Sequence, residues 1–122
     1  MKKNLALIFL FQLVFYACSW DNEEDLYPEL PVCDSLNVSY QQDLVPIFSN
    51  SCYSCHSHIN APDFGVGISL ENYEDVVAFS APIVATVNHE DGYPAMPRAA
   101  DQLDSCAISK IEAWVNSGTP DN

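Results

Sequence analysis

The sequence is poor in positive charge. Only 4 of its 122 residues are Lys or Arg, against 17 Asp and Glu, and the formal net charge is −13. Lys2 and Lys3 lie at the N-terminus, which leaves Arg98 and Lys110 for the rest of the chain. A nucleic-acid-binding surface needs clustered basic side chains to displace counterions from phosphates. The composition therefore excludes nucleic acid as a partner.

A run long enough to span a membrane is also missing. The apolar stretch from Leu5 to Ala17 is 13 residues long, with Gln12 inside it, whereas a helix needs about 20 residues to cross a bilayer. A basic start, a short apolar segment and a small residue before Cys18 instead predict a signal peptide over residues 1–17. The apolar fraction of 48% excludes a disordered acidic chain, and the length predicts a single domain.

Cys18 is the first of five cysteines. The segment Phe15-Tyr16-Ala17-Cys18 resembles the lipobox of bacterial lipoproteins, which implies a diacylated Cys18 at the mature N-terminus, anchored to a membrane of the cell envelope. Ordinary secretion, with Cys18 as a spare thiol, is the alternative. The acidic residues that follow resemble the surface-export signal of Bacteroidetes lipoproteins, but a solvated tether explains them as well. The periplasmic face and the outer surface both stay open.

The mature chain divides into a tether and a domain. Residues 18–37 contain two prolines and no apolar period, and we expect the domain over residues 38–122. A helix is predicted over residues 43–52, capped by Asp43, and residues 57–67 are predicted to form a loop. The apolar residues on one face of that helix are Leu44, Ile47, Phe48 and Cys52.

The second half of the domain contains the clearest helix signal. A short helix is expected from Asn72, and residues 82–87 fit helix and strand equally well because they are rich in β-branched residues. The last helix is predicted to begin after Asp104 or Ser105 and to stop at Gly118. Its apolar stripe comprises Ile108, Ile111, Trp114 and Val115.

The motif that indicates chemistry is C-x-x-C-H, formed by Cys52, Cys55 and His56. This is the attachment pattern for c-type haem. Two thiols three residues apart on one helical turn can add to the two vinyl groups of a porphyrin, and the adjacent imidazole then lies under the iron. The predicted export is consistent with this interpretation, because haem is attached covalently outside the cytoplasmic membrane.

The residues from Cys33 to Asn122 resemble the mono-haem cytochrome c domain of small Bacteroidetes lipoproteins. The segments that carry the resemblance are Asp43–Phe48, Cys52–His56, Leu70–Val76, Asn88-His89, Gly92, Met96-Pro97 and Ile111–Gly118. The resemblance implies an all-α fold of about four short helices around one covalent haem c. It also implies Met96 as the sixth iron ligand opposite His56, with His89 as the alternative. The aromatic side chains expected to line the haem crevice, or simply to pack the core, are Phe48, Tyr73 and Trp114.

Two cysteines remain once lipid and haem are assigned. Cys33 and Cys106 are expected to form a disulfide, since a pair of thiols in an oxidising compartment normally does. Such a bond closes a loop of about 70 residues and adds a few kcal/mol of stability. The alternative is two separate buried thiols.

These features predict an electron carrier that works with redox partners bearing a basic docking face. It is not an enzyme, since no nucleophile or acid–base pair stands out. One alternative is a zinc-binding module that uses Cys52, Cys55 and either His56 or His58, with His89. Structural zinc usually needs two C-x-x-C knuckles, and only one is present. The other alternative is a cofactor-free lipoprotein with a Cys52–Cys55 disulfide.

Overall fold

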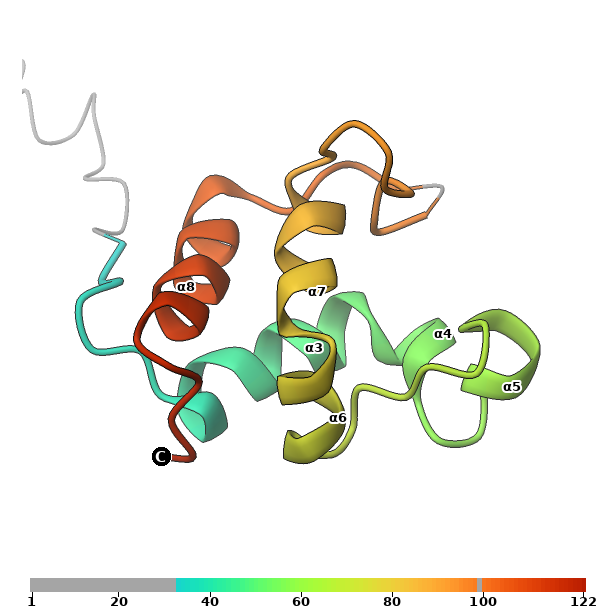
Figure 1. Cartoon of the computed structure of the whole chain (residues 1–122), viewed down its shortest axis with the longest axis horizontal. Helices are drawn as coiled ribbons and strands as arrows, with labels where there is room; N and C mark the ends of the chain where they lie inside the picture. Colours follow the sequence, from blue (N-terminus) through green and yellow to red (C-terminus); the bar gives the residue numbers. More distant parts are fainter. Residues whose placement is uncertain (1–32, 99) are drawn as a thin grey trace, which may run out of the picture. The chain divides into compact units, whose positions relative to one another are not determined.

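The computed structural model describes residues 33–98 and 100–122, and this part of the chain is helical and contains no strand (Figure 1). Residues 33–122 form one compact unit. The predicted signal peptide, Cys18 and the tether as far as Val32 lie outside the described residues. The helical segments are η1 (Tyr40–Leu44), α3 (Val45–Ser51), α4 (Tyr53–His56), α5 (Ala61–Phe64), α6 (Tyr73–Ala78), α7 (Ser80–Val87) and α8 (Ser105–Asn116).

The first helical run starts earlier than the sequence predicts. Its N-cap is Ser39, whose hydroxyl accepts a hydrogen bond from the Gln42 N–H at 3.2 Å. Asp43 is therefore not the cap: its carboxylate reaches back and accepts from the Ser39 N–H at 2.9 Å. This reciprocal arrangement satisfies two backbone donors at a helix start, which explains why the helix gains its additional turn.

The prediction of about four helices is too low, because two helical turns that the sequence did not predict, α4 and α5, add to the expected ones. Cys52, with φ −119°, separates α3 from α4, and Phe79, with φ −105° and ψ 13°, separates α6 from α7. The predicted loop over residues 57–67 also contains a helical turn, α5. This turn has Pro62 near its start, where a missing N–H costs nothing.

The later helices follow the sequence more closely. Helix α6 begins directly after Asn72, as expected, and the ambiguous residues 82–87 are helical, within α7. Helix α8 is capped by Asp104, whose carboxylate accepts from the N–H groups of Cys106 and Ala107, both at 3.0 Å. Gly118 follows the end of α8 with a φ of +92°, a conformation that favours glycine.

An aromatic cluster fills the core beneath these helices. Tyr40 lies with its ring centroid 5.1 Å from that of Tyr73 and 5.5 Å from that of Trp114. Trp114 and Phe48 are each 1% exposed. Of the three aromatic residues expected near the haem crevice, none lines the cavity described below, so their role is core packing.

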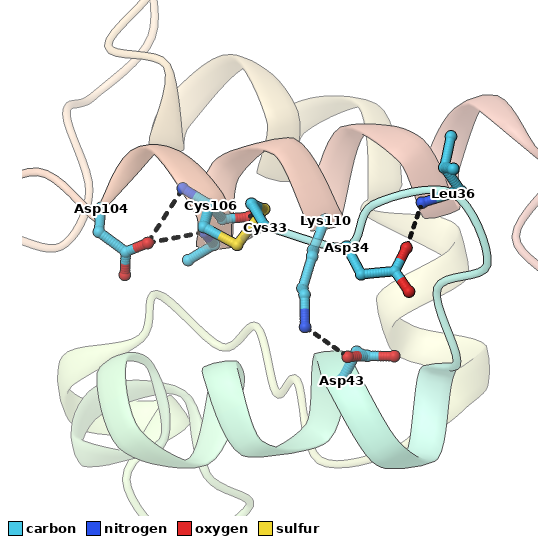
Figure 2. Close-up of a disulfide and its surroundings, with 8 residues drawn as sticks. Cys33, Asp34, Leu36, Asp43, Asp104, Cys106 and Lys110 are labelled. Carbon is cyan, nitrogen blue, oxygen red and sulfur yellow. Dashed lines mark hydrogen bonds and ion pairs between the residues drawn. A yellow bond between two sulfur atoms is a disulfide. The ribbon is translucent and has the colours of Figure 1, made fainter. Parts of the chain in front are cut away.

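Both ends of the unit are bonded to helices: the N-terminal end to α8 and the C-terminal end to η1. The sulfurs of Cys33 and Cys106 form a disulfide across 73 positions of sequence, the pairing that the cysteine count suggests (Figure 2). Lys110 on α8 donates to the carboxylate of Asp43 at 2.6 Å. At the C-terminus, the Asn122 side chain accepts from the Tyr40 N–H at 2.8 Å. These contacts hold the first and last helices together.

Candidate functional site

The C-x-x-C-H motif lies on the last turns of the first helical run. The carbonyl of Cys52 accepts from the Cys55 N–H at 3.0 Å and from the His56 N–H at 2.8 Å. This tight turn brings the two thiols and the imidazole to one cavity, which all three side chains line. Both thiols are free and half-buried, so neither is consumed by a disulfide.

The imidazole of His56 is oriented by the segment that follows α5. Its Nδ1 lies 2.9 Å from the carbonyl oxygen of Ile68, and the Leu70 N–H donates to the His56 carbonyl at 2.8 Å. Because a carbonyl only accepts, Nδ1 carries the proton, and in the neutral ring Nε2 therefore carries the lone pair. A ring held in this tautomer is ready to bind iron through Nε2.

Gly65 makes room for the motif, and the sequence analysis did not identify it as a site residue. A Cβ at this buried position would lie 2.7 Å from the Cys55 carbonyl oxygen and 3.0 Å from Nδ1 of His56. The backbone of α5 therefore approaches the motif more closely than any side chain allows. Its place in a glycine-containing loop was the only sequence signal, and that signal is typical of turns in general.

The cavity has a volume of about 350 Å³, within the usual range of small-molecule and cofactor sites. Part of its lining comes from the motif and the loop after it, and part from α7 and the turn around Met96. Two of its lining residues, Phe64 and Val66, are 68% and 83% exposed. An apolar ligand in the cavity would reduce this exposed apolar surface. The lining side chains include Cys52, Cys55, His56, Phe64, Val66, Ile68, Leu70, Phe79, Pro82, Ile83, Thr86, Val87, Pro94, Met96, Pro97, Arg98 and Leu103.

Met96 is held in this wall through its backbone. Its N–H donates to the Thr86 carbonyl on α7 at 3.0 Å. On the other side, Nε2 of His89 lies 3.1 Å from the Met96 carbonyl and is therefore the donor in that hydrogen bond. The structure thus brings together the motif and the residue that the resemblance implies as sixth ligand.

The other histidines lie elsewhere. His89, the alternative sixth ligand, is exposed and does not line the cavity. It reaches the site only from behind, through a hydrogen bond from Nε2 to the Met96 carbonyl and one from its backbone N–H to the Thr86 carbonyl at 3.3 Å. His58 is also outside the cavity and contacts Ser69 and Asn72.

The motif holds one thiol in an apolar environment. Burial, with a smaller contribution from the neighbouring Cys55, raises the pKa of the Cys52 thiol to about 11. Within residues 33–98 and 100–122, no group of three or more His, Cys, Asp or Glu side chains is placed to hold a metal ion. A haem iron differs, since it takes only two ligands from the protein.

Comparison with models of known protein families, with curated proteins and with solved structures gives no match. Among the described residues, no helix has the length and apolar character needed to cross a membrane. The function must therefore be argued from the site itself.

Proposed function

We propose that the protein is a one-electron carrier with a single c-type haem, attached to Cys52 and Cys55 and ligated by His56 and Met96. The observation that carries this proposal is that the motif and Met96, which follows His56 by 40 residues, line the same apolar cavity. A c-type haem, when bound, supplies an iron that alternates between ferrous and ferric states, at a potential that a methionine ligand raises.

The residues around the cavity are suited to hold such a group. The hydrogen bond from His56 to the Ile68 carbonyl fixes the imidazole and leaves Nε2 to bind. The backbone of Met96 is held by Thr86 and His89, so its side chain extends from an anchored turn. The lining is mostly apolar, and a haem held by both His56 and Met96 would have no position left for a substrate. This is the reason to propose a carrier rather than an enzyme.

The charge of the chain indicates the kind of partner. Residues 33–122 contain 12 Asp and Glu against two basic residues, and one of these two, Lys110, is paired with Asp43. Such a surface attracts redox proteins with a basic face. The predicted signal peptide and the lipobox-like segment before Cys18 are the reason to propose a carrier in the cell envelope, anchored through a lipid on Cys18.

The first experiment is to export the full chain in a host that matures c-type haem and to record oxidised and reduced visible spectra. After denaturation and acid–acetone extraction, the colour should remain on the wild-type chain. It should be released from a Cys52→Ser, Cys55→Ser double variant. The ligand assignment is tested with Met96→Ala, which should change the oxidised spectrum, and with the matched His89→Ala, which should leave iron ligation intact.

Three outcomes would contradict the proposal. A colourless chain with one bound zinc would favour the zinc module. A colourless chain with a Cys52–Cys55 disulfide would favour a cofactor-free lipoprotein. Covalent haem whose oxidised spectrum responds to His89→Ala and not to Met96→Ala would replace the proposed ligand pair with two histidines.

The partner proposal has its own test. Electron exchange with a small cationic oxidant should be faster than with an anionic oxidant of similar driving force, and added salt should narrow the difference. Equal rates at low ionic strength would show that the acidic surface does not steer the reaction.

A further inference from the structure

The imidazole of His56 depends on a short segment of chain that no helix stabilises. Residues 68–70 run past the motif without regular secondary structure. They bond His56 twice, through the Ile68 carbonyl to the ring and through the Leu70 N–H to the backbone carbonyl, at 2.9 and 2.8 Å. Any movement of this segment therefore changes the hydrogen bond that orients the ring.

A carboxylate holds this segment in place. Glu71 directly follows the segment, and its Oε2 accepts a hydrogen bond from the backbone N–H of His58 at 2.6 Å. Close by, the Ser69 hydroxyl lies 3.1 Å from Nδ1 of His58, and the Glu71 N–H donates to the Ser69 hydroxyl at 3.4 Å. Glu71 is thus one of the side chains that join the turn after His56 to the segment that bonds its ring, and it also lies 3.9 Å from Nε2 of His58.

We propose that Glu71 is a positioning residue that sets the electron-donating strength of His56. This inference rests on the proposed function, because it concerns the imidazole as an iron ligand. A short hydrogen bond from Nδ1–H to the Ile68 carbonyl makes the ring more basic, and a more basic ligand stabilises ferric iron. If Glu71 is lost, the segment moves, the Nδ1 hydrogen bond weakens and the reduction potential rises.

Two conservative variants separate the hydrogen bond from the charge. Glu71→Gln removes the charge but keeps an oxygen at the same reach, whereas Glu71→Asp keeps the charge and shortens the side chain by one methylene. The full chain, exported with haem, is titrated for its midpoint potential and for its free energy of unfolding. For Glu71→Asp we expect a three- to tenfold shift toward the reduced form at a fixed potential, which is about 30–60 mV. Glu71→Gln should stay close to the wild type.

The outcomes distinguish this inference from the proposed function. Wild-type protein without covalent haem defeats both. Haem-loaded variants that lose stability while their potential stays unchanged make Glu71 a structural tie only and overturn the inference alone. A shift in Glu71→Gln with none in Glu71→Asp assigns the effect to charge and overturns it too. If Glu71→Asp is too unstable to isolate, the NMR resonance of the His56 Nδ1 proton is compared between the wild type and Glu71→Ala, which removes the acceptor oxygen. An altered shift or faster exchange in Glu71→Ala supports the inference, and a wild-type shift and exchange rate overturn it.

Discussion

Replacing Gly65 by alanine tests whether close contact between α5 and the motif is needed for the site. The added Cβ would lie 2.7 Å from the Cys55 carbonyl oxygen, 3.0 Å from the Cα of Ala61 and 3.0 Å from Nδ1 of His56. Heavy atoms in contact normally lie about 3.5–4.0 Å apart, so the neighbours must move by about 0.5 Å or more. Two of these neighbours are backbone atoms, which cannot rotate away. We therefore expect a loss of about 1–3 kcal/mol in the free energy of unfolding, as for other overpacked sites.

Gly67→Ala is the matched control. Gly67 has a φ of +78°, and its Cβ would meet nothing within 4 Å, so alanine there costs about 1–2 kcal/mol of backbone strain without touching the motif. Denaturant unfolding should show both variants destabilised by similar amounts. Only Gly65→Ala should also change the oxidised spectrum and the potential, because only its Cβ displaces His56. A Gly65→Ala protein with wild-type stability and potential would refute the reasoning.

Three further predictions concern stability and can be measured by denaturant unfolding of the full chain. The hydrogen bond from Lys110, with a smaller contribution from the Ser39 N–H, lowers the pKa of Asp43. At pH 7, Asp43→Asn should therefore lower the free energy of unfolding by up to about 1 kcal/mol. This difference between variant and wild type should vanish as the pH falls below about 4 and through the folded-state pKa of Asp43. An unchanged difference at low pH would show that the carboxylate charge is not the cause. Replacing both Cys33 and Cys106 by serine should lower the free energy of unfolding by about 4 kcal/mol, because the disulfide closes a loop of 73 residues and so reduces the entropy of the unfolded chain. A loss below 1 kcal/mol would contradict this. Tyr40→Phe should be neutral or stabilising by about 1 kcal/mol, since its hydroxyl is buried with no hydrogen-bond partner among the described residues; a clear loss would mean that the hydroxyl is in fact bonded.

The sequence predicted the helix ends correctly where a capping side chain or a glycine with positive φ sets them. Asp104 caps α8 and Gly118 follows its end, because both act on the nearest turns. The Asp43 cap was wrong, since Ser39 competes for the same role four residues earlier. The count of helices was too low because α4 and α5 have four residues each and are too short to show an apolar period.

The sequence by itself determined the chemistry that this site offers: the two thiols, the adjacent imidazole and the acidic composition are local or additive properties. With the proposed lipid and haem assignments, it also left Cys33 and Cys106 as the pair for a disulfide. The tertiary structure alone decided that Met96 and the motif share a cavity, while His89 lies outside it. Likewise, it assigned Phe48, Tyr73 and Trp114 to the core, and Gly65 and Glu71 to the surroundings of His56. These assignments depend on contacts between residues distant along the chain, and such contacts exist only once the helices pack.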